Sequence, residues 1–363
     1  MIMRIGILTF HCARNYGAML QCYALQEWLS ACGHDVSVLN YRPDYMDCDT
    51  PKFRWWYLKP TSPLRSLKRV CRIFPTLKRR HRLFEYFEKA FFRLTPPLAC
   101  KSDLDRVAAG YDCIIIGSDQ VWNSRHNGAD PVWYGDISAS VRLVAYAASA
   151  GDARREDLEL LIKGLDRFAY VSVRESKLSE AITSLCPDAS QEIVCDPVFL
   201  SDPKIWSKWL ENKRKKPYVL VYQGRSNNNI IRIASEIAGK NKAEVISVDC
   251  YANSFTSKVK HVDVAPDGFV SLVNNALCVV TSSFHAAAMS MILHTPFFVV
   301  RLDDGADERA HDCLLKMGLA ERMIGVGASP DEIRMEFEIS DSMIEAHRQR
   351  SREFLRKALE SCI

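Results

Sequence analysis

The chain has 363 residues, of which 48% are hydrophobic and 25% are charged. At roughly 150 residues per domain, this length predicts two domains and excludes a single small module. The composition is that of a globular protein and excludes disorder over the whole chain. There are 48 basic and 44 acidic residues, and a net charge of only +4 does not indicate a nucleic-acid binder.

The 13 cysteines are odd in number, scattered and never spaced as CxxC. This pattern argues against a disulfide scaffold and favours a reducing compartment. The apolar start, residues 1–10, is interrupted at once by His11, Arg14 and Asn15, so we expect no secretory signal peptide. No stretch reaches the roughly 18 uncharged apolar residues of a membrane span. We therefore expect a cytoplasmic protein that meets a membrane only from the side.

The first part of the chain alternates short apolar runs with segments of helical periodicity. We expect helices over residues 18–29 and 156–168, and strands over residues 4–10, 36–40, 113–117, 141–148, 170–173 and 193–194. A strand-helix-strand opening followed by further short strands predicts an α/β domain over residues 1–203.

After a polar, basic link at residues 204–216 the alternation starts again. The expected strands are 218–222, 244–248, 277–281 and 297–300, and the expected helices are 229–238, 267–275 and 283–293. This rhythm predicts a second α/β domain with a parallel sheet over residues 204–330. The charged tail, residues 331–363, is expected to be helical and to pack back across the first domain.

One segment departs from the α/β pattern. Residues 51–84 hold eleven Lys or Arg and no Asp or Glu, interleaved with aromatic residues. We interpret about residues 51–100 as a basic, aromatic helical insertion. Such a segment suits an anionic membrane surface, where cations meet the headgroups and Trp and Tyr settle at their level. A helical hairpin or a lid with its aromatics in the core is the alternative, and nucleic acid is the least favoured partner.

The turn at residues 15–18, with the sequence NYGA, follows the first expected strand. A turn of small residues at the carboxyl end of a strand lets backbone amides and a helix start approach an anion. Asn15, Tyr16 and Gly17 are therefore candidate binding residues. A helix cap with a tight turn explains the same sequence, and no GxGxxG motif supports a dinucleotide site.

A second polar segment, GSDQVWN at residues 117–123, follows the strand CIIIG. Polar side chains at this position can grip substrate hydroxyls, and Asp119 can orient a sugar hydroxyl or accept its proton. Asp119 can equally be an ordinary helix cap. The candidates from this segment are Ser118, Asp119, Gln120, Trp122 and Asn123.

Arg174, in the segment SVRES, follows another expected strand. A guanidinium there suits a carboxylate or phosphate through two parallel hydrogen bonds. Pairing of Arg174 with Glu175 or Asp196 is the structural alternative. Asp196, which precedes Pro197, is interpreted as part of a loop rather than as a catalyst.

The strongest candidate segment is TSSFH at residues 281–285, between a strand and the helix that begins at Ala286. Hydroxyls and free amides at a helix start form an anion site, and a histidine on its first turn can exchange protons with the bound group. Ser282, Ser283 and His285 are the candidates. A histidine in a helix can also serve packing alone. No metal-ligand spacing, Walker A loop, HExxH or GxSxG is present, and we expect no metal.

Six segments occur in order: NYGAMLQCYALQ, GSDQVWN, AYAASAG, SVRESKLSE, CDPVF and VVTSSFHAAAMS. In their order and spacing, from about residue 4 to residue 300, the chain resembles the polysaccharide pyruvyl transferase family. The resemblance implies two Rossmann-like domains that face each other across a cleft, the GT-B arrangement. It also implies transfer of pyruvate from phosphoenolpyruvate to a sugar of a polysaccharide or lipid-linked oligosaccharide precursor, as a ketal, without a cofactor.

Carried over to this chain, the resemblance implies that Arg174 clamps the donor and that His285 is the acid or base, with Asp119 orienting the acceptor. Ser149, in AYAASAG, joins the expected substrate-binding residues. Family members carry an arginine two positions before the histidine, where this chain has Ser283. A cation elsewhere would then have to compensate, and the candidates are Lys177, Arg225 and Arg301. Members also often have an acidic residue where this chain has Ala18.

Two other functions stay open. A GT-B glycosyltransferase that uses a nucleotide sugar would be expected to carry an E-x7-E motif in the second domain, and after residue 264 only Glu345 and Glu353 have this spacing. A non-catalytic polysaccharide-assembly protein would keep the fold without the donor site. If the acceptor is a lipid-linked saccharide, residues 51–84 would hold the protein at the inner face of a bacterial membrane.

Overall fold

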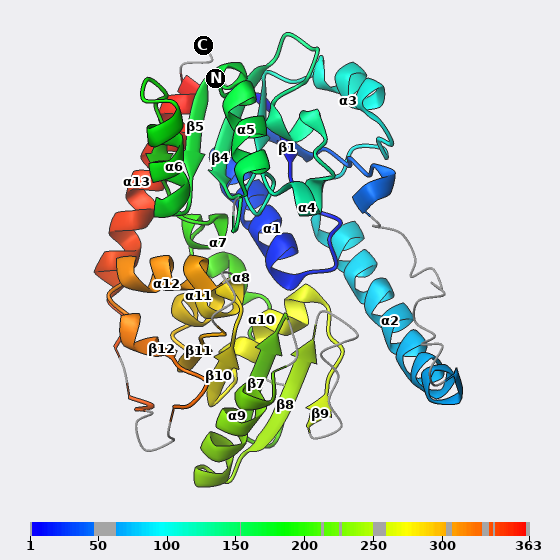
Figure 1. Ribbon diagram of the computed structural model, residues 1–363, viewed down its shortest axis with the longest axis vertical. Helices are drawn as coiled ribbons and strands as arrows, with labels where there is room; N and C mark the ends of the chain where they lie inside the picture. The colour runs from blue at the N-terminus through cyan, green and yellow to red at the C-terminus, as the bar shows by residue number, and fades with distance from the viewer. Residues whose placement is uncertain are drawn as a thin grey trace.

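The structure is a computed structural model that describes residues 2–46, 63–152, 154–211, 214–224, 227–249, 259–302, 307–328, 334–336 and 338–360. Two six-stranded sheets, each flanked by helices, form two domains stacked along the long axis of the molecule (Figure 1). The expected α/β fold with two Rossmann-like domains is confirmed.

The first sheet has the strand order β2-β1-β3-β4-β5-β6, and all its pairings are parallel. Apart from Arg4 and Arg142 at their first positions, its central strands β1, β3 and β4 are apolar, because helices cover both faces of a parallel sheet. Its strands are β1 (Arg4–Leu8), β2 (Asp35–Val38), β3 (Cys113–Ile116), β4 (Arg142–Ala148), β5 (Tyr170–Val173) and β6 (Glu192–Ile193).

The second sheet has the order β12-β11-β10-β7-β8-β9 and is also parallel. Two short edge strands, β9 and β12, were not predicted from the sequence. Its strands are β7 (Tyr218–Gln223), β8 (Glu244–Asp249), β9 (Lys260–His261), β10 (Cys278–Thr281), β11 (Phe297–Val300) and β12 (Met323–Ile324).

Twelve of the thirteen α-helices in the described residues accompany these sheets, and α13 follows the second one. The helices are α1 (Tyr16–Ala31), α2 (Pro63–Phe91), α3 (Lys101–Ala108), α4 (Ser124–Asn127), α5 (Arg155–Gly164), α6 (Ser176–Leu185), α7 (Pro197–Leu200), α8 (Lys204–Ser207), α9 (Asn228–Lys240), α10 (Pro266–Asn274), α11 (Phe284–Ile292), α12 (Asp307–Lys316) and α13 (Asp341–Glu360).

The start of α1 packs against the second domain. The ring of Tyr16 stacks on Phe269 of α10 with 4.6 Å between ring centroids, and its hydroxyl donates to the Val264 carbonyl over 3.0 Å. Tyr16 is fully buried. This aromatic contact therefore fixes one side of the junction between the two domains.

The tail helix α13 runs back along the first domain (Figure 1). The Ser351 hydroxyl accepts a hydrogen bond from the Cys195 amide (2.8 Å), and the Arg348 guanidinium donates to the Phe199 carbonyl (2.7 Å). The ring of Phe354 contacts Tyr170 of β5 edge to face. The expected return of the tail onto the first domain is confirmed.

The basic, aromatic insertion is represented by α2, a single helix with Pro75 in its interior; residues 51–62 lie outside the described part. Its last turns are core, since the buried Phe84 and Phe87 contact Tyr16 and Trp209. The aromatic residues at this end of α2 therefore belong to the core, as in the alternative interpretation of this segment.

The cations of α2 differ in exposure. Lys78, Arg79 and Arg82 are exposed, whereas Arg80 is only 4% exposed. None of the helices in the described ranges is long and apolar enough to cross a membrane. Eight described cysteines are free, as expected without a disulfide scaffold, but Cys12 is disulfide-bonded, which the sequence pattern did not predict.

Candidate functional site

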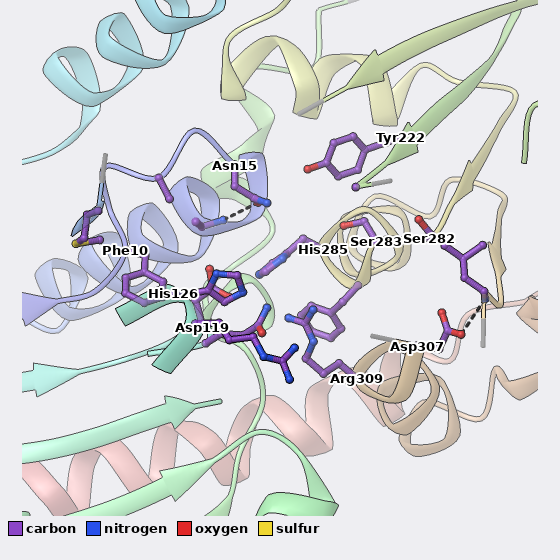
Figure 2. Close-up of a pocket in the computed structure, with 18 of the residues that line it drawn as sticks. Phe10, Asn15, Asp119, His126, Tyr222, Ser282, Ser283, His285, Asp307 and Arg309 are labelled. Atoms are coloured by element: carbon purple, nitrogen blue, oxygen red, sulfur yellow. Dashed lines mark hydrogen bonds between the residues drawn. The ribbon is translucent and has the colours of Figure 1, made fainter. Parts of the chain in front are cut away.

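A cavity of about 440 Å³ lies between the two domains. The loops after β1 and β3 form its first-domain wall, and the end of β7 with the starts of α11 and α12 forms the opposite wall (Figure 2). Parallel strands of each sheet end at this junction, where α/β proteins hold ligands. The lining residues include Phe10, Asn15, Tyr45, Met46, Asp119, Gln120, Arg125, His126, Tyr222, Ser282, Ser283, Phe284, His285, Asp307 and Arg309.

The NYGA turn forms the start of α1 beside this cavity. The Asn15 side-chain oxygen accepts from the amides of Gly17 (2.9 Å) and Ala18 (3.3 Å), so the cap itself occupies two amides that an anion would use. Asn15 lines the cavity, whereas Tyr16 points into the junction core. The turn is thus a capped helix start that contributes Asn15 and Ala18 to the cavity lining.

The loop after β3 has a backbone that presents Asp119 to the cavity. Gly117 has φ +116°, and a Cβ there would fall 2.5 Å from the Tyr146 carbonyl oxygen. Asp119 itself has φ 71°, a region that Asp tolerates better than most residues. Asp119 and Gln120 line the cavity, as predicted for residues in this loop.

The other candidates from this region lie behind the cavity wall. Trp122 is fully buried and donates to the Trp133 carbonyl (3.0 Å), which makes it a core residue. The Asn123 oxygen caps α4, and the Ser149 hydroxyl accepts from the Gly151 amide. The Ser118 hydroxyl donates to the Ala147 carbonyl. The structure brings none of these four to the cavity lining.

Arg174 does not face the cavity as an open clamp, because three carboxylates surround it. Its side chain is 4% exposed and pairs with Asp196, with Glu175 at 3.1 Å and with Asp119 at 3.5 Å. The guanidinium also lies over the Phe284 ring, 5.0 Å from the centroid. The pairing with Glu175 and Asp196, considered above as the structural alternative, is therefore present.

Asp196 is the centre of this cluster. Its Oδ2 contacts the Arg174 guanidinium, lies 3.5 Å from His285 Nε2 and accepts from the Ser118 hydroxyl at 3.4 Å, while its Oδ1 accepts from the Val198 amide. Burial acts to raise the pKa of this carboxyl, but His285 and Arg174 lower it to about 2. Asp196 is therefore ionised at neutral pH, and besides being the loop residue that caps α7 it lies between Arg174 and His285.

His285 joins the two domains at the cavity. Its side chain is 8% exposed, and its Nε2 has no hydrogen-bond partner although Asp196 Oδ2 lies 3.5 Å away. On the other side the ring lies against the backbone of Gly17, where a Cβ would be 2.1 Å from Nδ1. A histidine held between a carboxylate and a backbone, with one nitrogen free, is arranged to transfer a proton.

The start of α11 is open to the cavity. Its N-cap residue, Ser283, makes no side-chain capping bond, and the Ser283 amide itself donates to the Thr281 hydroxyl at 2.9 Å. Ser282 and Ser283 both line the cavity. Uncapped first-turn amides at a helix start attract an anion.

Sequence reasoning missed Arg309, on the first turn of α12, which lines the cavity (Figure 2). Of the cations expected to compensate for Ser283, neither Lys177 nor Arg301 lines it. Lys177 pairs with Glu308 at 2.8 Å and is exposed, Arg301 is exposed, and Arg225 lies outside the described residues. An α12 helix could have been predicted from the acidic start DE and the spacing of Ala310 and Leu314.

Two further features bear on the alternatives. Glu345 and Glu353, the only E-x7-E pair after residue 264, lie on α13, and neither lines the cavity. In the part of the chain that the structure describes, no group of three or more His, Cys, Asp and Glu is arranged to hold a metal ion.

Comparison with solved structures shows the fold. The UDP-N-acetylglucosamine 2-epimerase of Rickettsia bellii is similar over 100% of this chain and 97% of its own, with a TM-score of 0.54 and 12% identity. The UDP-GlcNAc 2-epimerase of Methanocaldococcus jannaschii, in complex with UDP-GlcNAc and UDP, is similar over 98% of this chain and 100% of its own (TM-score 0.52, 12% identity).

No curated protein matches the sequence. The model of the family described as Polysaccharide pyruvyl transferase matches residues 15–304, which is most of the chain. This range contains the capped turn, the Asp119 loop, the Arg174 cluster and His285. The chain therefore belongs to the polysaccharide pyruvyl transferase family.

Proposed function

We propose that the protein transfers pyruvate from phosphoenolpyruvate to a sugar of a polysaccharide or lipid-linked oligosaccharide precursor and forms a ketal. The observation that carries the proposal is the position of His285. It lies on the first turn of a helix with an open start, with Nε2 3.5 Å from an ionised buried carboxylate, and it lines a cavity between the domains.

The donor is a small, strongly charged anion. The open start of α11, with the hydroxyls of Ser282 and Ser283, offers donors to one of its anionic groups. In the reaction, a proton adds to the methylene carbon and leaves the adjacent carbon electrophilic. His285 is the group placed to deliver or accept protons, with Asp196 Oδ2 3.5 Å from its Nε2.

The acceptor supplies two hydroxyls. The first adds to the electrophilic carbon and gives up its proton, and the carbon–oxygen bond to phosphate then breaks with its electron pair going to phosphate. The second hydroxyl closes the ketal and also loses its proton. Of the two protons released, one replaces that delivered to the methylene carbon and the other leaves on phosphate. We propose that Asp119 orients the attacking hydroxyl.

The first-domain wall of the cavity supports a sugar acceptor. Tyr45 lines it and is 39% exposed, but its hydroxyl is already engaged: it donates to Asp130 (2.8 Å) and accepts from the Trp133 indole (2.7 Å). The ring is thereby held in place while part of its surface stays free. A fixed aromatic surface is suited to the apolar face of a sugar ring.

The test is phosphate release from phosphoenolpyruvate by the purified full chain, with a panel of methyl glycosides as acceptors and NMR detection of the ketal methyl group. We expect phosphate and ketal in equal amounts. We expect His285→Ala to lower turnover by a factor of about 100 or more with an unchanged melting temperature. Transfer from a nucleotide sugar in place of phosphoenolpyruvate, or full activity of the variant, would contradict the proposal.

A further inference from the structure

Two guanidinium groups lie beside the cavity, and they differ in their direct partners. Arg174 is buried among three carboxylates, so these four side chains together carry a net negative charge. Arg309 lines the cavity and makes no ion pair with any residue in the described ranges. Arg309 is near the same three carboxylates and Arg174, but none of these carboxylates pairs with it directly, so an anion in the cavity can reach its N–H donors.

Arg309 keeps unused hydrogen-bond donors. Its two terminal nitrogens lie 3.0 and 3.2 Å from the Gln120 side-chain oxygen when the amide is oriented with that oxygen toward the guanidinium. Its Nε is buried without a partner. A guanidinium has five N–H donors and stays charged in proteins, so Gln120 leaves most of its capacity unsatisfied. A buried unsatisfied donor on a cation is costly unless a ligand completes it.

The position of Arg309 is fixed by contacts of α12 with the first domain. The Ser176 hydroxyl donates to Asp312 over 2.8 Å, and the Lys316 ammonium donates to the Arg174 carbonyl over 3.3 Å. Both contacts lie on the same helix as Arg309, so the guanidinium is held on a rigid element.

Arg309 shares the cavity with the two features that attract an anion from the other side. The open start of α11 and the side chain of His285 line the same space (Figure 2). A planar fork of N–H groups facing a helix start is suited to an oxyanion with two or three oxygens.

We propose that Arg309 binds the oxyanion of the donor, phosphate or carboxylate, and that Gln120 is the positioning residue that holds the guanidinium across the domain junction. The proposal rests on the proposed function for the identity of the donor. Arg174 then has a different role, because it keeps Asp196 and Asp119 in place around His285.

The first test is binding of phosphoenolpyruvate, measured by calorimetry, to the full chain and its variants. We expect Arg309→Gln to weaken binding about 10- to 100-fold, as for loss of a charge-assisted hydrogen-bonded pair, with Arg309→Lys in between. Arg155→Gln, which removes a cation that is exposed and paired with Glu159 away from the cavity, should bind like wild type. Unchanged binding by a folded Arg309→Gln would overturn the proposal.

The second test uses Gln120. Gln120→Glu keeps the size and the contact but places a carboxylate on Arg309, and we expect binding to fall about as far as in Arg309→Gln. Gln120→Ala only releases the guanidinium, so we expect a smaller loss of binding than in Gln120→Glu. The loss should raise KM for the donor and leave kcat unchanged. A purely structural role for Gln120 would give the opposite order, because Glu preserves the packing.

Inorganic phosphate and pyruvate separate the two oxyanions. Each anion is tested for its ability to raise the melting temperature of the wild-type protein and of Arg309→Gln. The anion that stabilises the wild type but not the variant identifies the group that Arg309 binds. Absence of a shift by phosphoenolpyruvate, phosphate and pyruvate with wild type would overturn the proposal. Binding that depends on Arg309 without any ketal formed would leave this assignment standing and refute the proposed function.

Discussion

The imidazole of His285 lies directly against Gly17, so that a Cβ at Gly17 would fall 2.1 Å from Nδ1 and 2.2 Å from Cγ. No real pair of atoms approaches so closely without bonding, and the ring would have to move. A glycine in the first turn of α1 thereby sets where the histidine of the other domain can lie.

We predict that Gly17→Ala abolishes most activity and also destabilises the protein. The added methyl would lie 2.7 Å from His285 Cβ as well as against the ring, so rotation of the ring cannot relieve the clash, and its cost, about 1–3 kcal/mol, outweighs the gain of about 0.5–1 kcal/mol from alanine in a helix. Gly239→Ala in α9 is the matched control, because nothing lies within 4 Å of its Cβ position. It should stabilise the protein without affecting turnover. Equal activity of the two variants would show that His285 needs no fixed position.

The ionisation of Asp196 predicts how stability depends on pH. Its pKa is about 2 in the folded protein, below the ordinary 3.8, so the folded state favours the ionised form. This contribution, about 2 kcal/mol, is fully present above pH about 4 and is lost as the pH falls toward 2. Urea unfolding of wild type and Asp196→Asn at several pH values measures it. The difference in free energy of unfolding between the two proteins should shrink on acidification. A difference that grows would show that the folded state favours the protonated carboxyl.

Arg174→Ala tests the role given to the carboxylate cluster. Removing the cation leaves three carboxylates together at a buried site, and we expect a loss of about 3–5 kcal/mol in the free energy of unfolding. If Arg174 were instead an open clamp for the donor, the variant would lose only affinity for phosphoenolpyruvate. The loss in stability should be smaller at low pH, where the carboxylates can protonate. Chemical denaturation at pH 7 and pH 4 distinguishes the two roles.

The exposed cations of α2 allow a test of membrane association. We expect the full chain to float with anionic vesicles at low salt. Replacing Lys78, Arg79 and Arg82 by Gln should weaken binding roughly a hundredfold, at about 1 kcal/mol per cation. Arg80 is left unchanged, because it is only 4% exposed and its replacement would disturb packing. Unaltered flotation of the triple variant would remove α2 as the contact surface.

Strand positions could be predicted closely because they depend on local signals. The sequences CIII of β3 and FFVV of β11 are entirely apolar, and in a parallel sheet such a run indicates a buried strand. Of the polar residues that follow β3 and β10, Asp119, Gln120, Ser282 and Ser283 line the cavity between the domains. Ligands of α/β proteins bind at the carboxyl ends of parallel strands, and this rule can be applied from the order of the elements alone, without knowledge of side-chain contacts.

Contacts between distant residues could not be predicted from these signals. Asp196 precedes a proline and caps α7, which looks like a loop in sequence, yet its other oxygen meets Arg174 and His285. Arg309 enters the cavity only because α12 docks against the first domain. Trp122 shows the converse, since it lies next to lining residues in sequence but its side chain turns into the core.

The return of α13 to the first domain makes the second domain an insertion within the first. The chain crosses the junction once between β6 and β7 and again between β12 and α13. The hydrogen bond from Cys195 to Ser351 closes a loop of 156 positions, so the second sheet can form during synthesis before the first domain is complete. Two crossings therefore tie the domains together at two points, which limits their relative motion more than a single linker would.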